Sequence, residues 1–180
     1  MIEKEKKLSE EIIYNGKVVK LTKDIVECAN GKKAIREIIH HNGGSAVLCI
    51  NNQQQVLLIK QFRYAYNEVI YEIPAGKIEL NEDPKLTALR ELEEEAGIKA
   101  NKIEFLNVIY PTCGYSNEKI YLYYTDDFVF TKCHFDEDEY VEADFYDIEE
   151  VYKMIDEGKI NDSKIICALF QYVIRKNTIL

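Results

Sequence analysis

Hydrophobic and polar residues alternate in short segments over the first forty positions of the chain, a pattern typical of β-strands. The pairs Asn15-Gly16 and Asn30-Gly31 separate these segments, and both favour tight hairpin turns. The predicted strands in this region cover residues 12–14, 18–21, 24–28 and 33–40. We therefore expect residues 1–40 to form an N-terminal antiparallel β-sheet, and residues 41–180 to form one compact unit.

The pattern beyond residue 40 predicts further strands and three helices. Leu86, Leu89, Leu92 and Ala96 recur at helical spacing after Asp83-Pro84, a good helix start, and before Gly97, a good helix end. Two closing helices are expected near 148–157 and 162–175. The remaining predicted strands cover residues 45–50, 55–62, 69–73, 103–110, 119–124 and 140–146. A mixed sheet between helices, an α+β fold with an α/β/α sandwich, is the expected assembly.

Composition narrows the class of protein. With 180 residues, 47% hydrophobic and 31% charged, the chain is large enough for one globular core. A net charge of −9 disfavours nucleic acid as a partner, because phosphate binding needs a basic surface. The longest apolar runs are too short to span a membrane. Five scattered cysteines without C-x-x-C spacing, and no apolar leader, predict a reduced, cytoplasmic protein.

The residues that point to chemistry lie on the first predicted helix. Glu91, Glu94 and Glu95 stand at i, i+3 and i+4, so their carboxylates share one face. Like charges at this spacing destabilise a helix unless a cation lies between them, and oxygen ligands favour Mg²⁺ or Mn²⁺ over zinc. The alternative interpretation is a solvated acidic helix face, which is the commoner origin of a short glutamate run.

The surrounding residues favour the metal site. The segment from Gly76 to Ile98 resembles the Nudix box at each of its nine specified positions. These are Gly76, Glu82, Arg90, Glu91, Leu92, Glu94, Glu95, Gly97 and Ile98. The resemblance implies a Nudix fold and metal-dependent hydrolysis of a nucleoside diphosphate linked to another group.

The resemblance also implies roles for individual residues of the box. Glu91 and Glu95 would be the principal metal ligands and catalytic carboxylates, with Glu94 and the backbone carbonyl of Ala75 as further ligands. Mg²⁺ is the expected ion, and Mn²⁺ is a possible substitute. Glu82 and Arg90 would hold the loop and the helix together through an internal ion pair.

Residues flanking the box narrow the family resemblance to ADP-ribose pyrophosphatases. The segments are Leu58–Tyr64 and Tyr71–Glu79. By this resemblance Arg36 and Arg63 would bind the substrate, a role suited to bidentate, permanently charged donors. The alternative is that both are surface arginines paired with nearby glutamates.

Two loops carry further expectations from the same resemblance. In 111–118, Glu118 would contact the substrate or order the loop, although Cys113 stands where the subfamily usually has proline. In the acidic loop 136–139, Glu137 would act as the base for the attacking water and Glu139 as a late metal ligand; their roles are exchangeable.

The function predicted from the sequence is therefore hydrolysis of ADP-ribose or a related nucleoside diphosphate sugar into a nucleoside monophosphate and a sugar phosphate. Two alternatives remain open. One is hydrolysis of another nucleoside diphosphate derivative, such as a dinucleoside polyphosphate. The other is a non-catalytic module that binds ADP-ribose. The subfamily resemblance further implies a homodimer that uses the N-terminal sheet.

Overall fold

The structure is a computed structural model that describes residues 3–133 and 140–178. The chain divides into two compact units. The first unit contains residues 1–43 and 110–119, and the second contains residues 44–109 and 120–180. The assignment of 110–119 to the first unit was not expected from the sequence.

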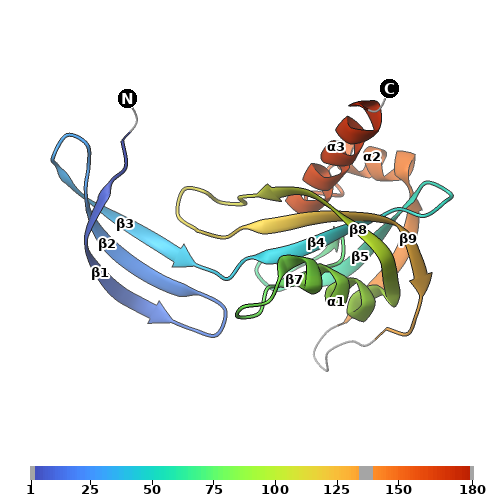
Figure 1. The fold of residues 1–180 in the computed structure, drawn as a ribbon, viewed down its shortest axis with the longest axis horizontal. Coiled ribbons are helices and arrows are strands. Elements are labelled where there is room, and N and C mark those ends of the chain that lie inside the picture. Colours follow the sequence, from blue (N-terminus) through green and yellow to red (C-terminus); the bar gives the residue numbers. More distant parts are fainter. Residues whose placement is uncertain (1–2, 134–139, 179–180) are drawn as a thin grey trace. The chain divides into compact units, whose positions relative to one another are not determined.

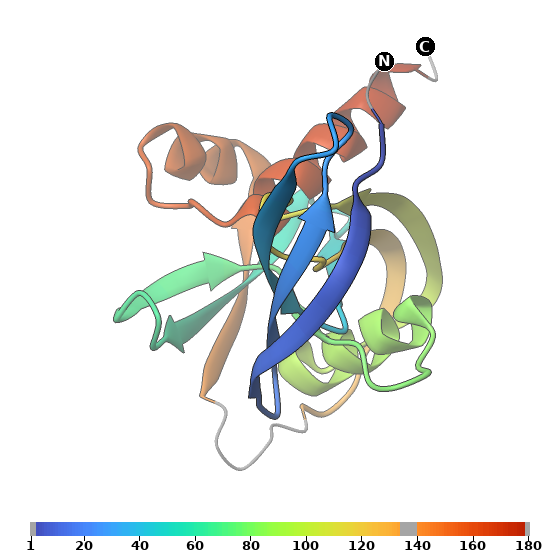
Figure 2. The ribbon, with the colours of Figure 1, turned by 90° about the vertical axis from the view of Figure 1, so that its left-hand side faces the viewer.

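The first unit is built on a three-stranded antiparallel sheet in the order β1-β2-β3 (Figure 2). Its strands are β1 (Lys6–Asn15), β2 (Lys20–Glu27) and β3 (Lys33–His40). Hairpins form at both predicted turns, and Gly31 has a φ of 74°, which glycine adopts without strain.

One strand prediction in this unit was wrong. Residues 18–21 and 24–28 were expected to be separate strands, but 20–27 is the single strand β2. The polar Thr22 and Asp24 interrupt the hydrophobic pattern, yet both are buried. The Thr22 hydroxyl lies 2.9 Å from Nε2 of His40 on β3, so a hydrogen bond replaces apolar packing at this point.

The loop 110–119 joins the first unit through backbone hydrogen bonds to the end of β3. Ile39 N–H donates to the Tyr115 carbonyl at 2.8 Å, and Asn117 N–H donates to the Ile39 carbonyl at 3.1 Å. The side chain of Asn117 also accepts from the His41 N–H. These bonds link segments that are far apart in the sequence, which local patterns do not reveal.

The second unit contains two sheets (Figure 1). One is mixed, in the order β7-β4-β9-β8, with β4 and β9 parallel and the other pairs antiparallel. The other is antiparallel, in the order β10-β5-β6. The strands are β4 (Gly44–Cys49), β5 (Gln55–Arg63), β6 (Glu68–Glu72), β7 (Ala75–Lys77), β8 (Ile98–Ile109), β9 (Ile120–Phe130) and β10 (Val141–Asp147).

Helices cover both faces of the mixed sheet, which confirms the predicted sandwich (Figure 1). The helices are α1 (Pro84–Ala96), α2 (Ile148–Asp156) and α3 (Ser163–Thr178). Strand β4 shows the arrangement most clearly, because alternate side chains enter different cores. Val47 and Cys49 pack with residues of α1, whereas Ala46 and Leu48 pack with residues of α2 and α3.

Helix α1 begins and ends as predicted. At its start, the Asp83 side chain accepts a hydrogen bond from the Lys85 N–H at 2.8 Å. Gly97 ends the helix in the left-handed conformation at φ 58°. Strand β8 follows at once from Ile98, five residues before the predicted start, because this glycine reverses the chain without a loop.

The predicted apolar stripe on α1 was partly wrong. Leu86 is 59% exposed. The buried face instead contains Thr87, Ala88, Leu92 and Glu95. A carboxylate therefore occupies a core-facing position of this helix, where hydrophobicity alone would place leucine. Among the described residues, no helix combines the length and the apolar character needed to cross a bilayer.

Candidate active site

The candidate site is the junction between β7 and α1, which places the Ala75–Gly76 backbone of β7 against the acidic helix. Glu95 is 2% exposed, and its carboxylate accepts a hydrogen bond from the Ala75 N–H at 2.9 Å. Because an unpaired buried carboxylate is costly, this bond fixes helix α1 against β7. Ala75 and Glu95, both predicted metal ligands, are thus in contact.

Gly76 lets the loop approach the helix closely. A Cβ atom at this position would lie 1.8 Å from Oε1 of Glu91, far inside van der Waals contact. Any side chain here would displace the Glu91 carboxylate or the strand. The first residue of the box therefore leaves room for the Glu91 carboxylate beside the backbone of β7.

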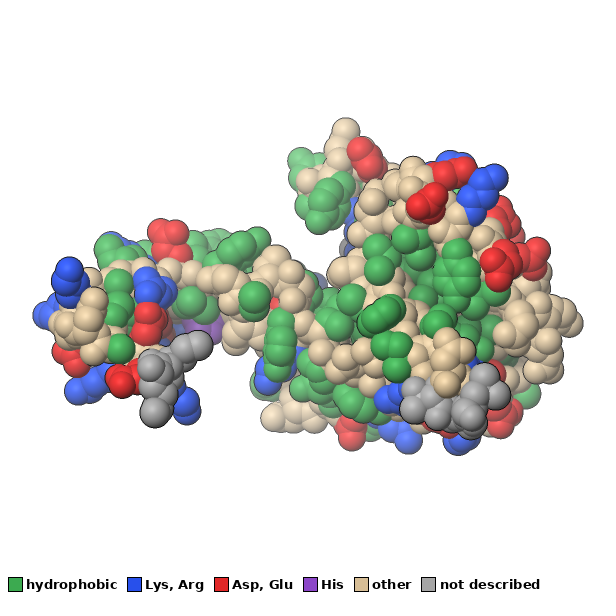
Figure 3. Space-filling model, turned by 90° about the horizontal axis from the view of Figure 1, so that it is seen from above, with side chains coloured by type: hydrophobic (Ala, Val, Ile, Leu, Met, Phe, Trp, Pro, Cys, Tyr) green, Lys and Arg blue, Asp and Glu red, His purple; other side chains and the backbone are tan. Residues whose placement is uncertain are grey.

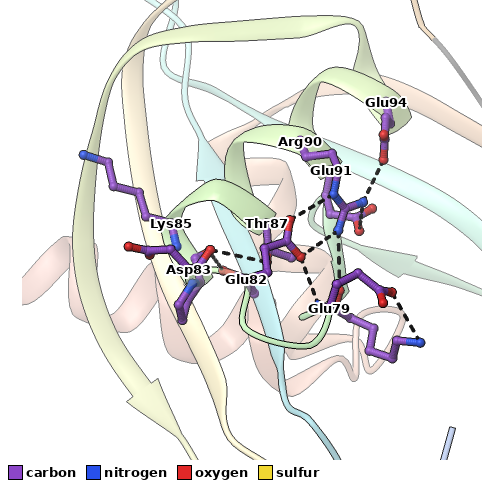
Figure 4. Close-up of polar contacts among 11 residues, drawn as sticks. Glu79, Glu82, Asp83, Lys85, Thr87, Arg90, Glu91 and Glu94 are labelled. Carbon is purple, nitrogen blue, oxygen red and sulfur yellow. Dashed lines mark hydrogen bonds and ion pairs between the residues drawn. The ribbon is translucent and has the colours of Figure 1, made fainter.

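Arg90 lies at the centre of the remaining carboxylates (Figure 4). Its guanidinium donates to Glu82 at 3.2 and 3.4 Å, to Glu91 at 2.7 Å and to Glu94 at 2.9 Å. The predicted ion pair between Arg90 and Glu82 is therefore present. Its Nη2 also lies 3.5 Å from the Lys77 carbonyl, so one side chain ties the helix to the loop that precedes it.

Electrostatics at this junction follow from these contacts. Burial disfavours the charged form of Arg90, but the hydrogen bonds and charges of Glu82, Glu91 and Glu94 outweigh it and raise the pKa of Arg90. Burial also opposes ionisation of Glu82, yet the hydrogen bond from Arg90 holds the pKa of this carboxyl below its ordinary value. Glu82 and Arg90 are therefore both charged and form an ion pair at the centre of the junction.

The chemistry of these donors suits a hard divalent cation. Several carboxylates gather where α1 meets β7, and carboxylate oxygens are the ligand type of Mg²⁺ and Mn²⁺. Over residues 3–133 and 140–178, however, no three acidic, histidine or cysteine side chains are arranged to hold a metal as they stand. Glu91 and Glu94 face Arg90, and Glu95 faces the Ala75 N–H, so a bound cation must compete with these partners.

A second charged group in this unit surrounds Arg63 of β5. Its Nε and Nη2 donate to the two carboxylate oxygens of Glu72 on β6 at 2.6 and 2.7 Å. Lys164, at the start of α3, lies 3.2 Å from Glu72 and 2.8 Å from Asp162. Burial opposes ionisation of Glu72, but Arg63 and Lys164 keep the pKa of its carboxyl below the ordinary value.

The other predicted site residues lie in the first unit or outside the described residues. Arg36 on β3 forms an ion pair with Glu5, and both side chains are well exposed. Glu118 has its Oε1 3.4 Å from Nδ1 of His41. Glu137 and Glu139 fall outside the residues that the structure describes.

Sequence reasoning assigned no site role to Glu72 or Lys164. The glutamates near Arg63 were expected only as partners that would make it a surface residue. One signal was available: Glu72 is the single charge in the apolar run from Val69 to Ile73. An acid in such a run needs a buried cationic partner, and Lys164 and Arg63 provide it.

Comparisons with known proteins agree with this geometry. The NUDIX domain model matches residues 40–169. A crystal structure described as an ADP compounds hydrolase superposes with a TM-score of 0.83 at 20% identity, covering 98% of this chain and 95% of that chain. At this identity the likeness shows the fold.

Two curated relatives align over nearly the whole chain. An ADP-ribose pyrophosphatase of Bacillus subtilis (strain 168) is 37% identical over 171 residues, which is 94% of this chain and 92% of that protein. A methanol dehydrogenase activator of Bacillus methanolicus is 40% identical with the same coverage. Hydrolases of the matched family generally use divalent metal ions. The box geometry, the family match and these relatives together confirm that the chain belongs to the Nudix family.

Proposed function

We propose that this protein is a divalent-metal-dependent pyrophosphohydrolase that splits ADP-ribose, or a closely related nucleoside diphosphate sugar, into a nucleoside monophosphate and a sugar phosphate. The observation that carries the proposal is the complete box, in which Glu95 and Glu91 pack on the Ala75–Gly76 backbone. The similarity to an ADP-ribose pyrophosphatase over 94% of the chain supports the choice of substrate.

The metal would be held by Glu91, Glu94, Glu95 and the Ala75 carbonyl, with Glu139 as a late ligand. Mg²⁺ is the proposed ion, and Mn²⁺ a substitute. Such an ion, when bound, offsets the charge of the diphosphate and lowers the pKa of the attacking water. When Glu91 and Glu94 turn from Arg90 to the metal, Arg90 would retain its hydrogen bonds to Glu82 and to the Lys77 carbonyl. The helix would therefore stay joined to the preceding segment.

Protein groups would orient the substrate and accept the proton. Arg36, Arg63 and Glu118 are the proposed substrate contacts. Because Glu72 takes the Nε–Nη2 edge of Arg63, a phosphate oxygen would meet the Nη1 side of its guanidinium. Glu137 is the proposed base that orients the attacking water and removes its proton.

The decisive experiment is a substrate panel with a metal series. Purified protein is incubated with ADP-ribose, GDP-mannose or diadenosine polyphosphates in Mg²⁺, Mn²⁺ or EDTA, and products are separated by chromatography. We expect AMP and ribose 5-phosphate from ADP-ribose, and no products in EDTA. Faster cleavage of diadenosine polyphosphates would mean that they, and not ADP-ribose, are the substrate. Binding of ADP-ribose without cleavage in either metal would support the non-catalytic alternative.

The proposed assembly is a homodimer formed through the N-terminal sheet. Several large apolar side chains of this sheet are exposed, and Figure 3 shows apolar side chains among its charged ones. They include Leu8, Ile12, Tyr14, Ile25 and Ile35. Large apolar side chains left exposed on a sheet are typical of a surface that another chain covers. Light scattering after size exclusion should give twice the 21.0 kDa chain mass, and a mass of one chain would contradict the proposal.

The proposed location is the cytoplasm. All five cysteines are free thiols in the structure, which agrees with a reducing compartment. Fractionation of cells that produce the tagged protein tests this, with the protein expected beside cytoplasmic markers.

A second candidate function is activation of another enzyme. The observation that favours it is the 40% identity to a methanol dehydrogenase activator over 94% of the chain. The test measures methanol dehydrogenase activity with the wild-type protein or the Glu95→Gln variant added. A rise with the wild-type protein alone would mean that activation uses the same hydrolytic site, and no rise with either would remove this candidate.

A further inference from the structure

Four charged side chains form a continuous chain of contacts inside the second unit. Asp162 contacts Lys164 at 2.8 Å, Lys164 contacts Glu72 at 3.2 Å, and Glu72 holds Arg63 through two hydrogen bonds of 2.6 and 2.7 Å. The signs alternate along the chain, so each charge has an opposite neighbour. This order is what allows four charged groups to be placed together with little access to water.

Three of the four groups are largely buried, and Arg63 is the more exposed end of the chain of contacts. The side chain of Glu72 is 2% exposed, that of Asp162 9% and that of Lys164 14%, whereas Arg63 is 39% exposed. Burial works against the charge on Lys164, but the charges of Asp162 and Glu72 outweigh it and raise the pKa of this lysine. Lys164 is therefore charged in the folded protein, and its position is fixed by two carboxylates.

The chain of contacts joins α3 to the neighbourhood of the active site. Asp162 accepts a hydrogen bond from the Ile165 N–H at 3.2 Å, so the same carboxylate that holds Lys164 also caps the start of α3. Glu72 ends β6, three residues before Ala75, whose N–H donates to Glu95. The hydrogen bonds from Arg63 to Glu72 are the main cause of the raised pKa of Arg63, and the negative charge of Glu95 adds to it. Arg63 is therefore close enough to the box for the charge of Glu95 to act on it.

We propose that Lys164 is a positioning residue for substrate binding, acting through Glu72 to hold the guanidinium of Arg63 with its Nη1 side available to the substrate's diphosphate. The inference rests on the proposed function for the identity of the substrate. Without Lys164, Glu72 keeps one cationic partner, and the second constraint on its carboxylate is lost. Arg63 then loses its fixed orientation while the box carboxylates keep theirs, so substrate affinity falls and the chemical step is largely preserved.

The kinetic test is a double-mutant cycle on Lys164 and Arg63. We expect Lys164→Met to raise KM for ADP-ribose about tenfold and to change kcat less than about threefold. In an Arg63→Ala background the same substitution should change KM less than about twofold, because the group it positions is gone. Lys164→Arg should restore most of the affinity. The matched control is Lys159→Met, which removes an exposed lysine paired with Glu157 and should leave KM unchanged.

An equal rise of KM in both backgrounds, or no rise in the wild-type background, would overturn the inference. If Lys164→Met does not fold, Lys164→Gln takes its place in the cycle. A second measurement does not need turnover. It follows the exchange with water of the Arg63 Nε–H proton by ¹⁵N NMR, and the signal is assigned by its loss in Arg63→Lys. Its exchange with water should be at least about tenfold faster in Lys164→Gln. Unchanged exchange would refute the role of Lys164, whereas absence of ADP-ribose hydrolysis with slow Nε–H exchange would refute only the proposed substrate.

Discussion

The two units place the same kinds of charge in different surroundings. In the N-terminal sheet, Arg36 and Glu5 have side chains 40% and 37% exposed, whereas in the second unit Arg63 pairs with Glu72, which is 2% exposed. Water and salt screen an exposed pair, so its geometry is weakly held, but removing one partner of a buried pair is strongly destabilising. The buried charged side chains of the second unit are therefore held in fixed positions, whereas most charged side chains of the N-terminal sheet can change position.

Asp24 is a charged residue of the N-terminal sheet that is buried but lacks a short hydrogen bond to its cationic partner. It is buried, and its Oδ2 lies 3.4 Å from Nζ of the half-exposed Lys7. In the second unit, Glu72 and Glu95 are buried with short hydrogen bonds to a guanidinium and a backbone N–H. The difference shows that burial alone does not fix a charge, and that close directional donors are also needed.

The largest effect should come from Glu95→Gln. The amide oxygen can still accept from the Ala75 N–H, so the fold is kept while the charge is lost. We expect kcat for ADP-ribose to fall at least about 10³-fold, equal to about 4 kcal/mol of activation free energy. Glu10→Gln in the N-terminal sheet, which removes an exposed charge paired with Lys7 and Lys20, is the control and should keep full activity.

Retained activity in Glu95→Gln would mean that this carboxylate is structural and that the proposed ligand assignment is wrong. Thermal melting of both variants in EDTA separates this case from simple unfolding. We expect Glu95→Gln to melt close to the wild-type temperature.

The next effect compares two glycines. Gly76→Ala forces a Cβ to within 1.8 Å of the Glu91 carboxylate, so we expect kcat to fall about 10²-fold through misplacement of Glu91. Gly31→Ala in the N-terminal sheet meets no atom within 4 Å and strains only the backbone at φ 74°. It should destabilise by about 1 kcal/mol and leave kcat unchanged. Steady-state kinetics and urea unfolding measure both, and equal losses of activity in the two variants would contradict the close approach.

A smaller effect concerns stability and its pH dependence. Glu72→Gln leaves Arg63 and Lys164 with a weaker acceptor, and we expect a loss of about 2 kcal/mol in the free energy of unfolding near neutral pH. The pKa of Glu72 is lowered in the folded protein, so its contribution is complete above its ordinary value of 4.5 and declines as pH falls through the lowered pKa. Urea titrations at about pH 7 and about pH 3 should show the difference between variant and wild type shrinking. A difference that is as large in acid as at neutral pH would contradict the assignment of charge.

The smallest effect is expected from Arg36→Ala. Its pair with Glu5 is exposed, so we expect no measurable loss of stability at physiological salt. If Arg36 contacts the substrate as proposed, KM for ADP-ribose should rise about fivefold with kcat unchanged. Lys23→Ala, which removes another exposed cation of the same sheet, is the matched control for general charge. An equal rise in both variants would indicate long-range attraction in place of a direct contact.

The sequence predicted the architecture well where local rules apply. Asp83, Pro84 and Gly97 mark the ends of α1 correctly, because capping and the left-handed stop are decided within a few residues. The box resemblance also predicted the ion pair between Glu82 and Arg90, which the structure contains. The two pieces of β2 were predicted apart because the buried hydroxyl of Thr22 bonds to His40, which is distant in sequence.

The rest of the site depends on contacts that no local pattern contains. Lys164 lies 92 positions after Glu72, and their ion pair joins the start of α3 to the end of β6. The same holds for the hydrogen bonds between Ile39 and the 110–119 loop. Hydrophobic periodicity also placed Leu86 in the core, and it failed because Glu95 requires the buried side of the helix for its bond to Ala75.

The core-facing position of Glu95 has an evolutionary consequence. A selection for heat resistance alone would favour leucine or methionine at this place, because an apolar side chain would fill the helix stripe beside Leu92 without a desolvated charge. A selection for turnover would restore the acid each time. Thermostable descendants of this protein should therefore accumulate their stabilising substitutions elsewhere, and a lineage that becomes apolar at this position should be one that has abandoned hydrolysis.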